Sequence, residues 1–237
     1  MALTPYRIVR DIGVNRFQGI DTSLKSLRTF GYRPRKIIDG GAHLGHFALQ
    51  AKAIFPEALI HVIEPQPACR QDLETLSLTH NFLFHPCALA SEAEARKGNL
   101  RLAVEESPTT GAHIALAKTE AATVPVRTST LDQLFDRQIS PDDRTFLKLD
   151  LQGYELAALS GGIVVLKSIE VILTEVSFFA QAYEPSIATL IGFLNDKEFD
   201  LFDIASLSGR TRDNRLQQGD LVFVKRGSLL AFDTRWS

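Results

Sequence analysis

The stretch Ile37–Phe47, IIDGGAHLGHF, decides the fold class of this chain. A short apolar run leads into an acid and a pair of glycines, and an amphipathic segment follows at once. Gly40, Ala42 and Gly45 have the spacing G-x-A-x-x-G, the dinucleotide fingerprint with its middle glycine replaced by alanine. Such glycines let the backbone approach a ligand and let a helix pack closely on a strand. The stretch therefore predicts a strand, a ligand-binding turn and a helix.

Two acids narrow the choice of ligand. Asp39 stands directly before the turn, where it would repel a pyrophosphate bound over the helix N-terminus. It suits a ligand with a positive group, such as an ammonium or a sulfonium. Glu64 ends the next apolar run, and an acid at that position can bind both hydroxyls of a ribose. An adenosine with a cationic tail is S-adenosylmethionine; a plain tight turn with an unrelated surface acid is the alternative.

From residue 35 onward, short apolar runs alternate with segments of helical period. This pattern is typical of a parallel sheet covered by helices on both faces. The chain ends differently, because its last two apolar runs have no helix between them and predict an antiparallel pair joined by a long polar loop. The expected strands are 36–39, 59–64, 82–85, 146–150, 171–176, 199–204 and 220–225.

The chain divides unevenly. We expect a main domain at residues 35–237, preceded by an N-terminal helical lid or pack-on segment at residues 1–34. In that first segment Asp21 to Ser23 supply candidate N-caps for a short helix. The segment at about 90–128 fits neither the strand pattern nor the helix pattern, and we interpret it as a β-insertion on the ligand side of the sheet.

Composition excludes several classes of protein. The chain has 237 residues, a formal net charge of −2 and 45% hydrophobic residues, which is ordinary for a globular protein. It has no basic run for nucleic acid, no apolar run long enough for a bilayer and no apolar block of a signal peptide. Cys69 and Cys87 are too few and too distant for a CxxC site or a disulfide framework. We expect a cytoplasmic protein without nucleic-acid or membrane partners; the sequence leaves its oligomeric state undetermined.

Five blocks, in this order and spacing, resemble the FkbM family of S-adenosylmethionine-dependent methyltransferases: IIDGGAHLGHF, VIEPQP, STLDQL, LKLDLQGYE and LTEVSF. The resemblance covers about residues 35–225, and LKLDLQGYE is its most specific block. It implies a Rossmann-like class I methyltransferase fold of the α/β class, whose mostly parallel seven-stranded sheet ends in an antiparallel hairpin. It also implies methyl transfer, usually to a hydroxyl oxygen of a small molecule or sugar.

The same resemblance implies a cofactor site by position. His43 stands where members of the family often carry a small polar residue, and Cys87 and Ala88 offer adenine no obvious side-chain partner, so backbone groups would have to serve. The implied cofactor-binding residues are Asp39, Gly40, Gly41, Ala42 and Gly45 at the methionine part, Glu64 at the ribose, Pro65 and Gln66 in the loop towards the adenosine, Ala88 and Leu89 at the adenine, and Asp150 at the methyl end.

Candidate catalytic groups lie at the ends of the later strands, where ligands bind in open α/β sheets. Asp150 ends the fourth strand, Glu175 lies near the end of the fifth, and Glu155 falls in the first turn of the helix after Asp150. Positioning supplies much of the rate of methyl transfer, and a base adds roughly 10²–10⁴-fold. Asp150 is the first candidate and His43 an alternative base. A carboxylate cluster can also ligate magnesium, but no compact ligand motif supports a metal, so a divalent metal is possible and not favoured.

Two other functions compete with methyl transfer by an enzyme. An NAD(P)-dependent oxidoreductase shares the glycine spacing, although Asp39 and the terminal hairpin count against it. A non-catalytic module that binds S-adenosylmethionine would keep the pocket without the acceptor chemistry. Methylation of a nucleic-acid base is disfavoured, because the fourth strand lacks an Asn/Asp-Pro-Pro-aromatic turn. We expect acceptor specificity to reside in residues 1–34, 105–117 and 205–219.

Overall fold

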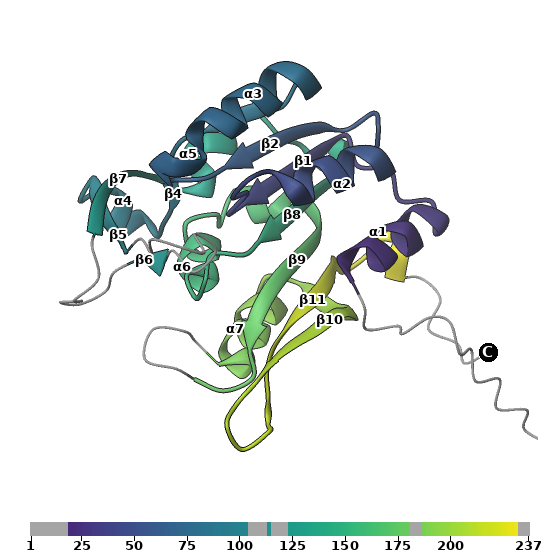
Figure 1. The fold of residues 1–237 in the computed structure, drawn as a ribbon. Helices are drawn as coiled ribbons and strands as arrows, with labels where there is room; N and C mark the ends of the chain where they lie inside the picture. Colours follow the sequence, from purple (N-terminus) through teal and green to yellow (C-terminus); the bar gives the residue numbers. More distant parts are fainter. Residues whose placement is uncertain (1–18, 104–112, 115–122, 181–185, 232–237) are drawn as a thin grey trace, which may run out of the picture.

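The computed structural model describes residues 19–103, 113–114, 123–180 and 186–231 of the chain. Seven strands form one large sheet in the order β10-β11-β9-β8-β1-β2-β3 (Figure 1). All seven strands expected from the sequence are present. They are β1 (Lys36–Gly40), β2 (Leu59–Ile63), β3 (Leu83–His85), β8 (Thr145–Leu149), β9 (Ile169–Ser177), β10 (Phe199–Arg210) and β11 (Leu216–Lys225).

The pairing of the strands confirms the expected fold class. β3, β2, β1, β8 and β9 are parallel neighbours, whereas β11 pairs antiparallel with both β9 and β10. The strand order turns back between β1 and β8, where Gly40 lies opposite Leu149 in the register. The carboxyl ends of β1 and β8 therefore meet at the switch point, the place at which open α/β sheets bind their ligands.

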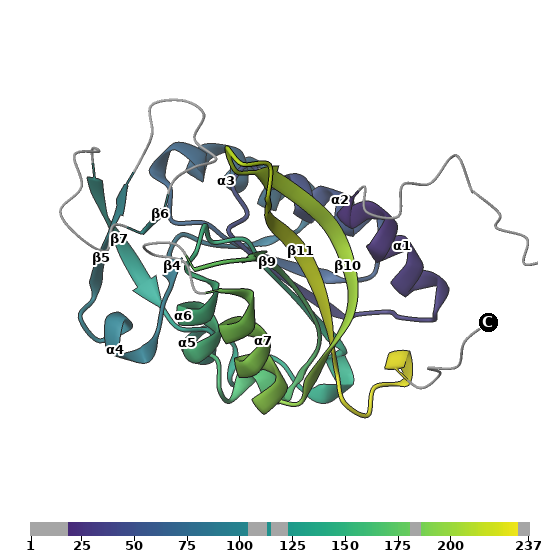
Figure 2. The same cartoon turned by 90° about the horizontal axis from the view of Figure 1, so that it is seen from below.

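Helices cover both faces of the sheet because its strands alternate their side chains between the two faces. In β1, Ile37 packs into the core under α1, α2 and α3, while its neighbour Ile38 packs into the core under α5, α6 and α7. Figure 2 shows both layers. The helices are α1 (Ile20–Thr29), α2 (His46–Ile54), α3 (Arg70–His80), α4 (Glu92–Ala95), α5 (Leu131–Phe135), α6 (Glu155–Ser160) and α7 (Ile187–Asp196), with short 3₁₀ turns at Pro67–Cys69, Pro141–Asp143, Val165–Lys167 and Leu229–Ala231.

A second, small sheet lies beside the large one. It consists of β4 (Ala88–Leu89), β5 (Asn99–Ala103), β6 (His113–Ile114) and β7 (Thr123–Ser129), in the order β4-β7-β5-β6. Its buried residues Leu102, Ile114 and Val126 form a third apolar cluster together with Tyr154 of the loop before α6. We propose that this sheet is an insertion at about residues 90–128 in a single domain at 35–237, with residues 1–34 as a separate pack-on segment.

Two details differ from the sequence prediction. The predicted long loop before the last strand is wrong, because β10 runs on to Arg210 and β11 starts at Leu216, paired from Ser206–Asp220 to Arg210–Leu216. Polar residues in this hairpin reflect its exposure and not a loop. The expected N-cap within Asp21–Ser23 is also wrong: α1 begins after Gly19, and Asp21 instead forms an ion pair with Lys25 one turn later.

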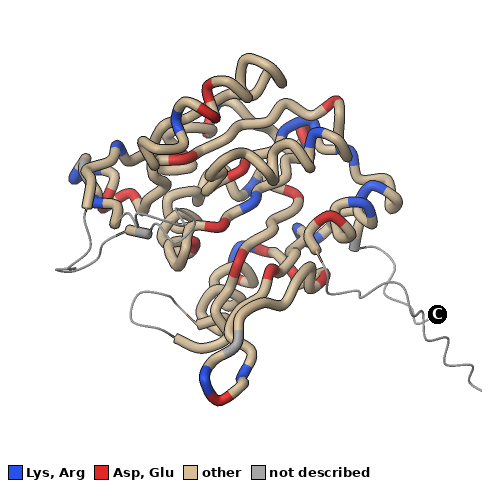
Figure 3. The backbone as a smooth tube through the Cα atoms, viewed as in Figure 1, with Lys and Arg blue, Asp and Glu red and all other residues tan. Residues whose placement is uncertain are grey.

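Within the described ranges, no helix combines the length and the apolar character needed to cross a membrane. Basic positions are interspersed with acidic ones along the traced elements (Figure 3). This distribution agrees with the formal net charge of −2.

Candidate active site

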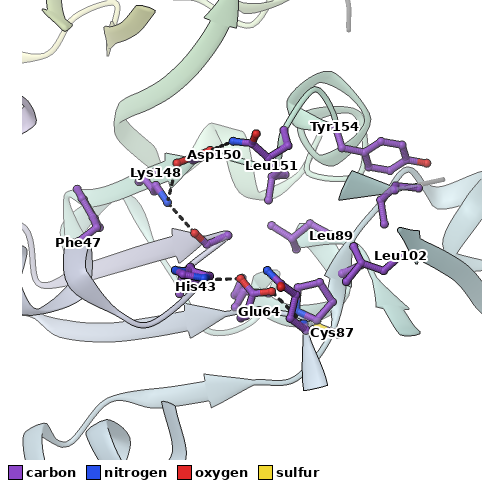
Figure 4. A pocket seen from close by; sticks show the side chains of 18 of the residues that line it. His43, Phe47, Glu64, Cys87, Leu89, Leu102, Lys148, Asp150, Leu151 and Tyr154 are labelled. Atoms are coloured by element: carbon purple, nitrogen blue, oxygen red, sulfur yellow. Dashed lines mark hydrogen bonds and ion pairs between the residues drawn. The ribbon is translucent and has the colours of Figure 1, made fainter. Parts of the chain in front are cut away.

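A cavity of about 310 Å³ opens at the carboxyl ends of β1, β2 and β8 (Figure 4). It brings together groups from three strand ends that are far apart in the sequence. Five of the residues predicted from the sequence do not line it, namely Asp39, Gly40, Gly45, Glu155 and Glu175. Nine do: Gly41, Ala42, His43, Glu64, Pro65, Gln66, Ala88, Leu89 and Asp150.

The glycines of the turn allow β1 to approach β8 closely. Gly41 has φ +74°, and a Cβ atom at this position would lie 1.9 Å from the carbonyl oxygen of Asp150. A Cβ atom at Gly40 would come within 2.8 Å of the Leu149 side chain. Gly45, at φ +78°, is the residue before α2. Gly40 and Gly45 thus shape the turn from outside the cavity, and Gly41 forms part of its wall.

Glu64 fastens the turn to the end of β2. One carboxylate oxygen accepts a hydrogen bond from the backbone N–H of His43 at 2.8 Å, and the other accepts from the N–H of Gln66 at 2.9 Å. Burial raises the pKa of Glu64, while these two hydrogen bonds oppose the rise. Each carboxylate oxygen has a further lone pair. The side chain lines the cavity and can therefore accept hydroxyl groups as well.

Asp39 does not face the cavity. Its side chain is fully buried, and the positive group beside it is Lys148 of β8, whose Nζ lies 3.1 Å from Asp39 Oδ1. The sequence reasoning expected a cationic ligand at this carboxylate and missed the lysine. The signal was present, because Lys148 is a charged residue inside a strand that is buried along its whole length. A charge in such a strand needs a partner.

Asp150 lies at the open end of the same strand. Its side chain is 41% exposed, and Oδ1 accepts a hydrogen bond of 2.8 Å from Gln152 Nε2. Gln152 has φ +53°, a left-handed backbone conformation that costs energy for a residue with a side chain. The amide of Gln152 also lies 3.3 Å from Glu175 Oε2, so one side chain bridges two carboxylates.

The other two predicted carboxylates stand behind Asp150. Glu155 accepts hydrogen bonds from the backbone N–H groups of Leu151, at 2.6 Å, and Gly153, at 3.4 Å, and so braces the loop after β8. Burial raises its pKa to about 7. Glu175 accepts from Gln218 of β11, and burial, with the nearby charge of Asp150 adding to the effect, raises the pKa of Glu175 to about 8.

Histidine and apolar side chains complete the wall. His43 has φ +48°, and burial, with the nearby His46 adding to it, lowers the pKa of His43, so that its imidazole is neutral at pH 7. The sequence reasoning left the details of the insertion open, because that segment shows no clear periodicity, and it therefore missed two buried residues of the small sheet. The lining residues that were not predicted are Ile20, His46, Phe47, Ile63, Cys87, Leu102, Ile114, Lys148, Leu151, Gln152 and Tyr154.

The described residues contain no group of three or more His, Cys, Asp or Glu side chains placed to hold a metal ion. The acidic groups near Asp150 are instead held by amide and backbone donors.

Comparison with known proteins places these features in a family. The family model "Methyltransferase FkbM domain" matches residues 39–201. Among solved structures, the FkbM methyltransferase of Methylobacillus flagellatus KT is 16% identical with a TM-score of 0.48, over 80% of this chain and 43% of that one. Precorrin-6y C5,15-methyltransferase of Geobacter metallireducens GS-15 is 13% identical with a TM-score of 0.44, over 86% of each chain.

An O-methyltransferase family protein of Burkholderia thailandensis is 11% identical with a TM-score of 0.45, over 86% of this chain and 55% of that one. This chain thus spans less than half of the Methylobacillus protein. No curated protein sequence matches it.

Proposed function

This chain belongs to the FkbM family of S-adenosylmethionine-dependent methyltransferases, and from that premise we propose that it methylates a hydroxyl oxygen of a small molecule or sugar. S-Adenosylmethionine supplies an electrophilic methyl group when bound. The residues of this chain then have to bind the cofactor, hold the acceptor in line with the methyl group and accept the proton of the hydroxyl.

The observation that carries the proposal is the cavity at the switch point. Gly41, Glu64 and Asp150 come from three different strand ends and line the same space. Its volume of about 310 Å³ falls within the range of small-molecule sites, roughly 300–1,000 Å³. The turn, with its close backbone approach, suits the cationic tail of the cofactor. The Glu64 carboxylate suits the ribose, and the apolar end of the cavity suits the adenine.

We assign the cofactor to these residues from one end of the cavity to the other. The methionine part lies against Gly41 and Ala42, and Glu64 binds the ribose hydroxyls, with Pro65 and Gln66 beside them. Ala88 and Leu89 border the adenine. Asp39, Gly40 and Gly45 do not line the cavity. In this proposal they support the methionine end of the site indirectly, by shaping the turn.

Asp150 and His43 are the candidates for contact with the acceptor. The Asp150 side chain is partly exposed at the methyl end, where an acceptor hydroxyl has access to its carboxylate. His43 lines the same cavity, and its lowered pKa leaves a neutral imidazole that can accept a proton. Glu155 and Glu175 act through Asp150 in this proposal, since neither lines the cavity: Glu155 is buried, and Glu175 shares the Gln152 amide with Asp150.

The competing functions differ in what they require of the site. Hydride transfer to a nicotinamide is not the chemistry of the matched family. A non-catalytic cofactor-binding module needs the turn and Glu64 but has no use for an accessible Asp150. The acceptor reaction is therefore the part of the proposal that needs a direct test.

The test is a methyl-transfer assay with labelled S-adenosylmethionine and a panel of sugars, small alcohols and amines. We expect transfer to at least one hydroxyl compound and none to the matched analogue in which that hydroxyl is replaced by hydrogen. Asp150→Asn is expected to reduce turnover about 10²-fold or more, the usual contribution of a general base, while S-adenosylhomocysteine binding persists. Unchanged turnover in Asp150→Asn would remove Asp150 from this role, and labelling of amines alone would remove the hydroxyl acceptor.

A further inference from the structure

Lys148 occupies the centre of the switch point. Its side chain is 6% exposed, and its Nζ atom lies among four groups at or just beyond the carboxyl ends of β1 and β8. It donates hydrogen bonds to the backbone carbonyls of Gly41, at 2.8 Å, and Gly40, at 3.3 Å. The carboxylate oxygens lie at 3.1 Å for Asp39 and 3.8 Å for Asp150. Figure 4 shows this ammonium between the turn and Asp150.

The charges around this lysine fix its protonation state. Burial alone would lower the pKa of Lys148, but the carboxylates of Asp39 and Asp150 outweigh it and raise the pKa overall. The ammonium is therefore charged at neutral pH. Nζ donates to two backbone carbonyls and forms an ion pair with Asp39, so groups of the protein itself engage this ammonium. Lys148 acts on the reaction only through the groups that it holds.

Those groups are the two sides of the methyl-transfer centre. On one side is the carbonyl of Gly41, in a turn so close to β8 that no Cβ atom fits. On the other is the Asp150 carboxylate, attracted by the ammonium and bonded to Gln152. The Asp39 carboxylate balances the charge of the Lys148 ammonium from a buried position outside the cavity lining. The lysine thus joins the wall at the methionine end to the proposed catalytic carboxylate.

We propose that Lys148 is a positioning residue for methyl transfer, which fixes the glycine turn and Asp150 relative to each other at the methionine end of the cofactor. This role rests on the proposed placement of the cofactor in the same cavity. It also assigns Asp39 a function different from ligand contact, namely to keep Lys148 charged and in place.

The variant for the test removes both partners of the buried ion pair. Lys148→Met alone leaves Asp39 buried without a counter-charge, which destabilises proteins strongly, whereas exchanging both members of such a pair is often tolerated. The double variant Asp39→Asn with Lys148→Met also keeps the net charge of the site. The matched control is Asp142→Asn with Lys167→Met, a pair of exposed residues outside the cavity. Lys148→Arg is the second variant, in case the double variant does not fold.

The measurement is calorimetric binding of two ligands, S-adenosylhomocysteine and 5′-methylthioadenosine. The second ligand lacks the amino-acid tail but keeps the adenine, the ribose and the sulfur. We expect the double variant, and Lys148→Arg, to bind S-adenosylhomocysteine about tenfold or more weakly, because the turn against which the amino-acid tail lies is no longer held in place. Binding of 5′-methylthioadenosine is expected to match that of the parent and of the control.

Every other result decides against the role of Lys148. Unchanged binding of both ligands would show that the turn holds its position without the lysine. An equal loss for both ligands would indicate a general structural role only. If the parent protein binds neither ligand, the proposed placement of the cofactor is wrong, and the role of Lys148 that rests on it falls with it. This outcome differs from the two above, in which the parent protein binds both ligands.

Discussion

Glu64 has a structural role in the turn and, in our proposal, a second role in binding the cofactor. Its two oxygens already accept hydrogen bonds from His43 and Gln66, which pins the glycine turn to the end of β2. The same oxygens border the cavity with lone pairs to spare. A buried acid with one backbone donor on each oxygen stays ordered, and an ordered carboxylate with free lone pairs is what a ribose diol needs.

Glu64→Ala tests this double role. The variant loses a charged acceptor for the ribose hydroxyls, and hydrogen bonds to charged groups contribute about 1.5–3 kcal/mol. We expect S-adenosylhomocysteine to bind roughly 10–100-fold more weakly in calorimetry. The control is Glu57→Ala, which removes an exposed acid just before β2. Parental affinity in Glu64→Ala would show that the ribose lies elsewhere.

For single residues, the sequence predicted the positions of the acids at strand ends better than it predicted the role of Lys148, a charged residue inside a strand. Glu64 and Asp150 follow directly from the position of apolar runs, because the carboxyl ends of parallel strands share one edge of the sheet. Asp39 has the same signature, yet its partner is Lys148, which comes from a strand whose lateral neighbour no local pattern reveals. Only the three-dimensional pairing of β1 with β8 shows that the two residues are in contact.

At the scale of elements, β2, β3 and α5 bring together two histidines, the buried His61 and the partly buried His85. His61 Nδ1 and His85 Nε2 lie 3.1 Å apart, the two rings stack at 5.3 Å, and Phe135 meets His61 edge-on at 5.0 Å. Burial, with His85 and then Lys36 adding to it, lowers the pKa of His61 to about 4. This pair lies outside the cavity lining, so its protonation affects stability and not the reaction directly.

A pH dependence of stability follows from His61. Its folded pKa of about 4 lies below the ordinary value of 6.5, so the unfolded chain binds the proton first as the pH falls. The contribution of His61 is present above pH 6.5 and is lost between pH 6.5 and 4, by about 3 kcal/mol in the free energy of unfolding. Denaturant titrations at pH 7, 6, 5 and 4.5 measure it.

His61→Phe provides the comparison for that titration. We expect the variant to lose less stability than the parent over the same pH range, because its aromatic ring carries no titrating group. The difference between the two curves isolates His61 from the carboxylates, which both proteins share. Parallel curves would contradict the assignment.

Elements also show where sequence patterns stop. The apolar runs predicted all seven strands of the large sheet. For β10 and β11, however, the predicted strands were too short at the hairpin end, so the turn between them was predicted as longer than it is. The extra pairs include polar ones such as Ser206 with Asp220, in which the Ser206 hydroxyl donates a hydrogen bond to the Asp220 carboxylate, so they show no apolar run. In the small sheet the strands are short and irregular, so the sequence around Leu102 and Ile114 shows no alternation of apolar and polar residues. Both residues nevertheless line the cavity.

At the scale of the whole molecule, the site exists because the chain reverses its strand order once. β1, β2 and β8 place a turn, the acid proposed to bind the ribose and a candidate catalytic acid around one cavity, and the small sheet supplies further apolar lining residues. The family match spans residues 39–201 and thus includes β2, β8 and the carboxyl end of β1. In our proposal, acceptor specificity resides in segments outside these strands, so neither the turn nor the sheet identifies the acceptor.

The most direct test of the central claim is calorimetric titration of the protein with S-adenosylhomocysteine, with NADH as the control ligand. A cavity that combines Gly41, Glu64 and Asp150 predicts saturable one-to-one binding of S-adenosylhomocysteine and no heat of binding with NADH. Binding of NADH without binding of S-adenosylhomocysteine would contradict the claim that this cavity holds the cofactor of a methyltransferase.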